Sequence, residues 1–366
     1  MLRLLFFWVI AFGLGAVAFD GYAAYEQPSY ERSRPKRIRR LLPITSKQQS
    51  LKKQDLGQFK PLPQVFSGRW SSPEAEEVAL GRMFFFDRRF SRNHDISCND
   101  CHPLDRYGMD NRGVSIGHVG QTGRRNAPSV YNAAGHGMQF WDGRAQDVEE
   151  QALMPMLDPG EMAMSEERVL QTVRSIPEYQ KRLKALYPQD VNPVSLHNVG
   201  RVIGAFERGL TTPSRWDRFL EGERAALSSA ERRGFVTFVS LGCPSCHASA
   251  LVGGTHFERL GQFKPWPNQT DWGTGEGSGA PMFKVASLRN VEKTAPYFHD
   301  ASADTLPAAV RKMAAYQLGL RLSEQQVKSV VTWLGSLTGS LPDYYIQPPK
   351  LPLASQSIPK PTRDGY

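Results

Sequence analysis

Two short motifs constrain this chain more than any other feature, Cys98-Asn99-Asp100-Cys101-His102 and Cys243-Pro244-Ser245-Cys246-His247. In a C-x-x-C-H motif the two thiols can form thioethers to the vinyl groups of one haem, and the imidazole that follows can ligate its iron. All four cysteines of the chain lie in these motifs, so none is left for a disulfide. A zinc ribbon is the alternative, but it places its C-x-x-C pairs roughly 15–20 residues apart. The sequence therefore predicts two covalently bound haems c.

The length of the chain and the spacing of the motifs predict two domains. The 366 residues exceed the roughly 250–300 at which a single core stops growing, and each half carries one motif. We expect an N-terminal domain over residues 71–220 and a C-terminal domain over residues 221–345. Before them we expect a signal peptide or anchor (1–24) and a polar basic linker (25–70), and after them a proline-rich tail (346–366).

Hydrophobic periodicity predicts a mainly α-helical fold. Ser72 can cap a helix that continues through Met83, and a second helix from Ser228 leads to Cys243. Further helical patterns cover residues 166–220, 307–318 and 323–337, whereas residues 103–160 are rich in glycine and show little helical period. No strand alternation of any length is present. We therefore expect two cytochrome c-like domains, each with one covalent haem c, joined by irregular loops.

The N-terminus predicts export. Residues 4–19 form an apolar run after Arg3, which is short for a membrane-spanning helix and favours a secretory signal over an uncleaved inner-membrane anchor. A basic run over residues 32–40 complicates the orientation. Attachment of haem c indicates an exported, periplasmic protein with the N-terminus as a potential membrane tether. The formal charge of +9 omits the anionic haem propionates, so it does not indicate a nucleic-acid partner.

Over residues 79–339 the chain resembles the bacterial di-haem cytochrome c peroxidases and the related methylamine-utilisation di-haem enzymes. The segments that carry the resemblance are LGRMFFFD at 80–87, SCNDCH at 97–102, RNAPS at 125–129, FWDGR at 140–144, EM at 161–162 and TAPYFHD at 294–300. Their order and spacing match the family pattern. The resemblance implies a function and a set of site residues.

For the N-terminal haem the resemblance implies His102 as the proximal ligand and His118 as a displaceable distal ligand, with His136 as the competing candidate. It also implies Glu161 as the general acid/base and Gln151 as its companion in the pocket. Breaking the O–O bond of peroxide moves a proton from one oxygen to the other, which a positioned carboxylate can carry. An ordinary solvated glutamate and a surface histidine are the alternatives.

For the second haem the resemblance implies His247 and Met313 as ligands, with Tyr316 as an alternative to Met313. Thioether ligation raises the reduction potential, which suits an electron-accepting haem. Trp141 would lie between the haems and assist electron transfer, or be an ordinary buried anchor. The resemblance further implies one calcium ion, held by the amide of Asn126 and by backbone carbonyls of Thr294 and Pro296.

The resulting expectation is a cytochrome c peroxidase that reduces hydrogen peroxide to water. Its electrons would come from a small redox protein, a cytochrome c or a blue copper protein, and family resemblance implies a homodimer. Two alternatives stay open. One is a di-haem oxidase that modifies amino-acid side chains of a partner protein, and the other is a non-catalytic electron-transfer protein.

Overall fold

The computed structural model describes residues 56–68, 73–275, 280–355 and 358–362. The predicted signal or anchor over residues 1–24 and most of the predicted linker lie outside the described residues. Within the described part, no helix is both long enough and apolar enough to cross a membrane. The fold is mainly helical, as predicted, with one small two-stranded sheet.

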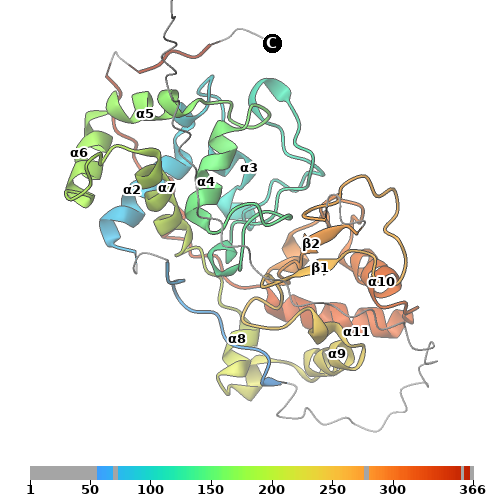
Figure 1. Ribbon diagram of the computed structural model, residues 1–366. Helices are drawn as coiled ribbons and strands as arrows, with labels where there is room; N and C mark the ends of the chain where they lie inside the picture. Colours follow the sequence, from blue (N-terminus) through green and yellow to red (C-terminus); the bar gives the residue numbers. More distant parts are fainter. Residues whose placement is uncertain (1–55, 69–72, 276–279, 356–357, 363–366) are drawn as a thin grey trace, which may run out of the picture. The chain divides into compact units, whose positions relative to one another are not determined.

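One group of helices carries the first motif, which lies in the short helix α3 (Figure 1). Its members are α2 (Ala75–Phe86), α3 (Cys98–Cys101), α4 (Val148–Leu157), α5 (Glu166–Arg174), α6 (Pro177–Leu186) and α7 (Leu196–Glu207). Both α2 and α4 pack against α7. The core between them is fully buried and includes Leu80, Phe84, Met156, Val202 and Ile203. This core holds the short helix α3, and with it the first motif, against α2.

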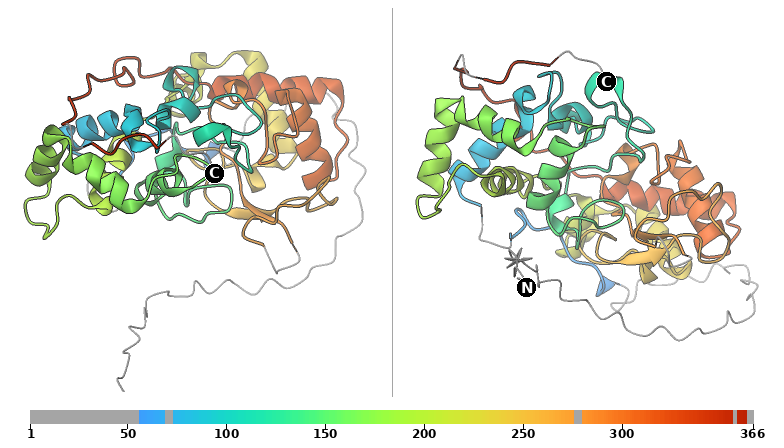
Figure 2. Two further views of the ribbon diagram at one scale, coloured as in Figure 1. Left: turned by 90° about the horizontal axis from the view of Figure 1, so that it is seen from above. Right: turned by 45° about the horizontal axis from the view of Figure 1, so that its top comes forward.

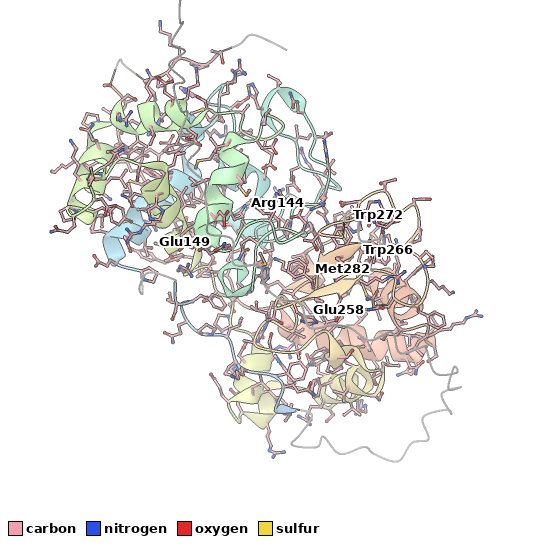
Figure 3. The ribbon with its side chains drawn as sticks, in the orientation of Figure 1. Arg144, Glu149, Glu258, Trp266, Trp272 and Met282 are labelled. Atoms are coloured by element: carbon pink, nitrogen blue, oxygen red, sulfur yellow. The ribbon has the colours of Figure 1, made fainter. Side chains whose placement is uncertain are left out.

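A second group of helices carries the second motif. Its members are α8 (Arg215–Leu220), α9 (Ser229–Ser240), α10 (Leu306–Gln317) and α11 (Glu324–Leu334). Trp216, Phe235 and Trp333 form the centre of its core, with ring centroids 4.8–5.4 Å apart. The strands β1 (Phe257–Arg259) and β2 (Met282–Lys284) pair antiparallel beside it. Figure 3 shows Glu258 of β1 and Met282 of β2 near Trp266 and Trp272, which come from the segment joining the strands.

Short 3-10 turns connect these elements. They cover Arg88–Phe90, Leu104–Arg106, His118–Gly120, Ala133–Gly135, Arg224–Ala226, Cys243–Ser245, Val291–Lys293 and Gly335–Leu337. One of them contains the first cysteine of the second motif. It follows Gly242, whose φ of 84° lets the chain turn sharply after α9.

Two local expectations are corrected. The N-cap of α2 is Glu74, whose carboxylate takes part in a capping box with Glu77, and not Ser72, which lies outside the described residues. The segment before Glu161 is also not entirely irregular, because α4 lies within it. Its apolar residues are mostly consecutive and Pro155 lies among them, which obscured the helical period.

Parts of the predicted linker and tail are packed against helices. Phe59 is buried in the core of the second group, 5.6 Å from Trp216 between ring centroids. At the other end of the chain, the carbonyl of Pro352 accepts a hydrogen bond from Arg89, and Ser355 N–H donates to the carbonyl of Ser175. The tail therefore runs along the first group of helices, dark red in Figures 1 and 2. Both segments are more ordered than their polar composition suggests.

A buried ion pair connects α8 to the segment before α10. Arg289 donates to both carboxylate oxygens of Asp217, at 2.7 and 2.9 Å, and Leu62 N–H donates to the same carboxylate at 2.7 Å. Both side chains are at most 5% exposed. Burial alone would raise the pKa of Asp217, but Arg289 and these backbone donors outweigh it and hold the pKa below its usual value.

Candidate functional site

The two motif histidines share one orientation. Nδ1 of His102 lies 3.0 Å from the carbonyl oxygen of Gly108, and Nδ1 of His247 lies 3.2 Å from that of Val252. A carbonyl only accepts, so each Nδ1 carries the hydrogen and each Nε2 keeps its lone pair. Burial lowers the pKa of His247 to about 4, which keeps this imidazole neutral. Each histidine is therefore prepared to ligate a metal through Nε2.

A cavity of about 280 Å³ lies beside the second motif. Cys243, Cys246 and His247 line it, and Met313 lines it from α10. Tyr316, the alternative to Met313, is not part of this lining and instead packs its ring 5.5 Å from that of Trp266. The lining is mainly apolar, so the cavity can accept a large apolar group. Two thiols, an imidazole and a thioether are available to bind that group.

Glycine permits a close approach behind His247. Gly253 has a φ of 130°, and a Cβ there would lie 3.2 Å from Nδ1 of His247 and 2.2 Å from the carbonyl oxygen of Ala286. A side chain at this position would push the imidazole out of place. The glycine therefore fixes the position of the ring relative to the cavity.

All four cysteines are free thiols in the structure. Burial raises the pKa of Cys243 to about 12 and that of Cys101 to about 11, with the carboxylates of Asp110 and Glu161 adding to the latter. Burial likewise raises the pKa of Cys98. A bound metal would itself deprotonate a coordinating thiol, so the separation of the two motifs and the histidine after each one, rather than these pKa values, weigh against a zinc site. The two motifs therefore fit covalent haem attachment better than a metal ion.

On the side of the first motif, His118 and Glu161 come together. The backbone N–H of His118 donates to the carbonyl of Glu161 at 2.6 Å, and the His118 side chain is 1% exposed. Its Nδ1 lies 3.6 Å from a carboxylate oxygen of Asp95, which Ser91 holds with a 3.0 Å hydrogen bond. Burial raises the pKa of Glu161, and the charge of Asp158 adds to it. A half-buried carboxyl with a raised pKa is suited to proton transfer.

Gln151 lies in the middle of α4, half-buried, and the loop that carries Glu161 follows the end of that helix. The loop is held to α4 by Met162 N–H, which donates to the carbonyl of Pro155, and by Met164 N–H, which donates to that of Met156. The helix that the sequence did not reveal thus positions the predicted acid.

Hydrogen bonds hold both the indole ring and the main chain of Trp141. Its indole N–H donates to the carbonyl of Asn126 at 2.8 Å, and its own carbonyl accepts from Lys284 N–H at 2.8 Å. The neighbouring Asp142 accepts from Arg125 at 2.6 Å, and Arg125 also donates twice to Asp271. Trp141 lines the cavity of the second motif. Its ring is therefore held in one orientation at the cavity wall.

The residues expected to bind calcium lie together. The Asn126 amide is 2.6 Å from the carbonyl oxygen of Pro296, and Asn126 and Thr294 both line the same cavity. The Asn126 Oδ1 atom is buried and has no hydrogen-bond partner among the described residues. The amide N–H of Asn126 donates to the carbonyls of Pro296 and Phe298, so Oδ1 would join these carbonyls at a cation only with the amide turned over. A buried amide oxygen without a partner is a ligand type that Ca²⁺ accepts.

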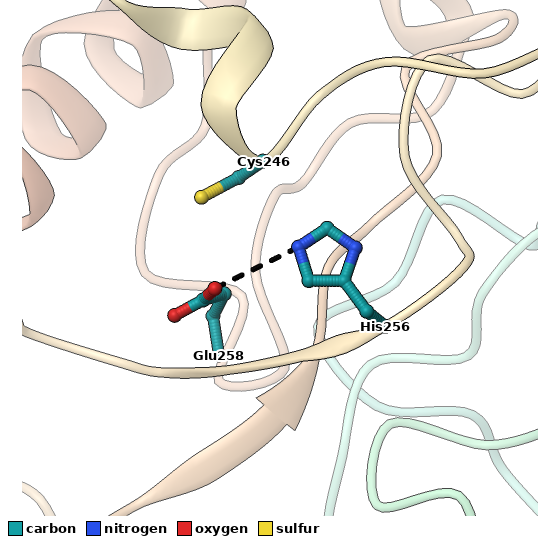
Figure 4. A group of neighbouring side chains, drawn as sticks. All are labelled: Cys246, His256 and Glu258. Atoms are coloured by element: carbon teal, nitrogen blue, oxygen red, sulfur yellow. Dashed lines mark ion pairs between the residues drawn. The ribbon is translucent and has the colours of Figure 1, made fainter. Parts of the chain in front are cut away.

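A further group of potential metal ligands, Cys246, His256 and Glu258, lies at the edge of the second motif (Figure 4). Nε2 of His256 is 3.7 Å from a carboxylate oxygen of Glu258. Because Cys246 belongs to the C-x-x-C-H motif, thioether formation would remove its thiol from this group. We therefore do not assign it as a metal site.

Sequence reasoning missed Asp95 and Lys284. Lys284 lies in β2 and contacts His136, and both line the cavity of the second motif. His136 thus lies with His247, although it was the competing candidate for the first haem. The strand that carries Lys284 is too short to show alternation of polar and apolar residues. The sequence therefore did not indicate that Lys284 is buried.

Comparison with known proteins gives a consistent result. The family "Di-haem cytochrome c peroxidase" matches residues 75–225. The cytochrome c551 peroxidase of Nitrosomonas europaea is 40% identical over 79% of this chain and 87% of that protein, and that of Pseudomonas aeruginosa is 38% identical over 83% and 90%. Among solved structures, a MauG-like protein associated with microbial copper homeostasis has a TM-score of 0.70 and 27% identity, covering 79% of this chain and 97% of the other.

Proposed function

The chain belongs to the di-haem cytochrome c peroxidase family, and on this premise we propose that it reduces hydrogen peroxide to water with electrons from a small redox protein. The observation that carries the proposal is the half-buried Glu161 carboxyl, whose pKa is raised and whose backbone carbonyl accepts a hydrogen bond from His118 N–H. The overall reaction takes two electrons and two protons for each peroxide and yields two waters. Proton delivery is the part that the protein's own side chains supply.

Family membership implies haem c as the cofactor, and the motif residues fit it. Cys98, Cys101 and His102 would hold one haem, and Cys243, Cys246 and His247 the other. Haem iron supplies an open coordination position for peroxide and stores and transfers single electrons. On this basis we propose two domains, each with one haem. The boundary expected between residues 220 and 221 moves to the connection between α7 and α8, because α8 (Arg215–Leu220) packs in the core of the second group.

We assign Glu161 as the group that moves a proton from one peroxide oxygen to the other, which then leaves as water. A carboxyl with a raised pKa can both accept this proton and return it. Gln151 is assigned as its companion in the pocket. His118 is assigned as the distal ligand that must leave before peroxide can enter, and Asp95 lies where it can accept from the released imidazole.

Met313 and Trp141 are assigned to electron transfer. Met313 is proposed as the second ligand of the haem at His247, since it lines the same cavity. Trp141 presents its indole ring at that cavity while being bound to the Asn126 segment, which supports a role in carrying electrons toward the first motif. A donor, either a cytochrome c or a blue copper protein, would dock near the second motif.

The experiment that tests the proposal is stopped-flow mixing of the half-reduced protein with peroxide. We expect a rapid spectral change and consumption of peroxide, followed by oxidation of an added reduced cytochrome c. A protein that only transfers electrons would have two six-coordinate irons, and neither would bind cyanide or peroxide after partial reduction. Such an outcome would reject the peroxidase function.

Oxidation of a partner's side chains is the other enzymatic candidate. A tyrosine ligand at the second iron would mark this chemistry. Tyr316 packs on Trp266 and is not part of the cavity lining, whereas Met313 is, which supports the peroxidase over this alternative.

We also propose one calcium ion at Asn126, Thr294 and Pro296, supported by the orphaned Asn126 oxygen. Periplasmic export follows from the need to attach haem c outside the cytoplasm. A homodimer and a membrane tether at the N-terminus stay predictions, for which light scattering and fractionation of the full-length protein are the tests.

A further inference from the structure

The side chains of Lys284 and His136 form a buried pair that the peroxidase mechanism does not use. Lys284 is 8% exposed. Its Nζ lies 3.0 Å from Nδ1 of His136 and donates to the carbonyl of Met138 at 2.8 Å. Both residues line the cavity that also contains Cys243, Cys246 and His247. The pair therefore faces the space in which the second haem would be held.

His136 has a hydrogen-bond donor without a partner. Because Lys284 donates to Nδ1, this nitrogen acts as the acceptor, and the ring hydrogen lies on Nε2. Nε2 is buried and makes no hydrogen bond among the described residues, although the nearby Gln139 side chain acts to raise the pKa of His136. The Gln139 amide N–H donates instead to the carbonyl of Ala133. Buried donors are normally satisfied, so an orphan at a cavity wall points to an acceptor inside that cavity.

Lys284 has a charge without a counterion. Within the described part of the chain, no carboxylate lies within ion-pair distance of its Nζ. Asp142 is the acidic residue that acts on it most, but its oxygens are bound by Arg125 and Arg144. Burial lowers the pKa of Lys284 to about 7. A buried ammonium group is costly unless an anion compensates it.

Two glycines place His136 next to the loop of His247. Gly137 N–H donates to the carbonyl of Gly254 at 2.9 Å, and a Cβ at Gly254 would lie 2.6 Å from Cδ2 of His136. The adjacent Gly253 contacts the His247 ring in the same way. The unpartnered donor and the unpaired charge thus lie against the structure that presents the proximal histidine.

We propose that Lys284 and His136 together bind a propionate of the haem attached at Cys243 and Cys246. A carboxylate has two acceptor oxygens, so one can accept from the Lys284 ammonium and one from Nε2–H of His136. The inference rests on the haem attachment given under Proposed function. It adds an electrostatic role, because a positive charge beside the propionate disfavours the oxidised haem.

Replacement of Lys284 by Met, which is similar in length but uncharged, tests the proposal. Spectroelectrochemical titration should show a lower midpoint potential for the haem at His247. At a fixed potential the ratio of oxidised to reduced haem should rise by roughly tenfold, as expected for one charge removed at close range. Resonance Raman spectra should show a shifted propionate-bending band.

Matched variants separate this role from a structural one. Lys284→Arg keeps the charge and should retain the parent potential, and Lys328→Met removes an exposed charge from α11 and should leave both readouts unchanged. His136→Phe should shift the Raman band, and it serves as the test if Lys284→Met does not fold.

The outcomes distinguish this inference from the function on which it rests. A Lys284→Met protein with covalent haem, an unchanged potential and an unchanged propionate band overturns propionate binding and leaves the peroxidase assignment intact. A parent protein that carries no covalent haem overturns the cofactor assignment itself.

Discussion

The backbone N–H of His118 and the backbone carbonyl of Glu161 are joined by a 2.6 Å hydrogen bond. The proposed distal ligand and the proposed acid are thus connected through main chain rather than through side chains. Gly117 makes this possible, since a Cβ there would lie 2.1 Å from the carbonyl oxygen of Gly160. A movement of the His118 loop and the position of the Glu161 carboxyl are therefore coupled.

Replacing Glu161 by Gln should slow the reaction with peroxide by roughly 10²–10⁴-fold, because glutamine keeps the shape but cannot carry a proton. The measurement is stopped-flow absorbance of the half-reduced protein. Glu167→Gln, at an exposed position of α5, is the control and should react like the parent. Equal rates in the two variants would remove Glu161 from the mechanism.

The raised pKa of Glu161 also predicts how the rate of the peroxide reaction depends on pH. Burial raises the pKa of Glu161 above its ordinary value of 4.5. The carboxylate must be ionised to accept the first proton, so the rate should fall as the pH drops through this raised pKa. Glu161→Gln should lose this limb of the profile. A limb that persists in the variant would assign the titration to another residue.

Gly117→Ala should slow the peroxide reaction without loss of haem, because the added methyl group would collide with the backbone at Gly160 and Glu161. Gly123→Ala is the control in the same loop, since a Cβ there comes no closer than 3.8 Å to its nearest neighbour. Haem content from absorbance and rates from stopped flow are compared. Unchanged kinetics in Gly117→Ala would show that the loop does not position Glu161.

Met313→Ala should lower the reduction potential of the haem at His247, because loss of a thioether ligand favours the oxidised iron. Tyr316→Phe should leave the potential and the spectrum of the reduced protein unchanged, since Tyr316 does not line the cavity. If the tyrosine variant changes the spectrum and the methionine variant does not, the ligand assignment is wrong.

Asn126→Ala should weaken calcium binding. Loss of even an outer-shell partner of a bound metal typically costs about 10–100-fold in affinity, and Asn126 is proposed as a direct ligand. Isothermal titration calorimetry of the chelator-treated protein gives the measurement. Asn126→Asp keeps an oxygen ligand and should bind, and Asn192→Ala alters an exposed loop and should match the parent. A parent protein without calcium affinity would refute the site.

Asp217→Asn should destabilise the fold by about 3–5 kcal/mol, because it leaves Arg289 as an uncompensated buried charge. The pKa of Asp217 is held below 3.8, so its contribution is fully present above about pH 4 and is lost as the pH falls through the folded value. Urea unfolding followed by circular dichroism should show this loss in the parent and not in the variant. The exposed Asp304→Asn is the control.

The sequence predicted the elements that have strong local signals. The helix before Cys243 begins after Ser228 as expected, because Ser228 and Glu231 form a capping box. The helix α4 was not predicted, since it is short, contains Pro155 and is stabilised by packing on α7. Tertiary contacts of this kind leave little trace in local periodicity.

In the candidate site, too, some residues had a local sequence signal and others became evident only in the folded structure. The motif histidines could be recognised from residue type and spacing alone. The Lys284–His136 contact joins residues 148 positions apart, and Lys284 becomes buried only when the two short strands pair. Distant electrostatic partners depend on the folded arrangement, so one sequence without its structure does not identify them.

Phe59 and Leu62 precede the first group of helices, yet Phe59 is buried in the core of the second group and Leu62 N–H donates to Asp217 of α8. Pro352 and Lys360 follow the second group, yet their carbonyls accept hydrogen bonds from Arg89 and Arg168 of the first. The described N-terminal residues therefore pack on the second group of helices, and the described C-terminal residues pack on the first. A single cut between α7 and α8 would not release two independent pieces, because the described terminal residues would still bind each piece to the other. Loss of either terminal segment would therefore remove contacts that hold one group of helices to the other.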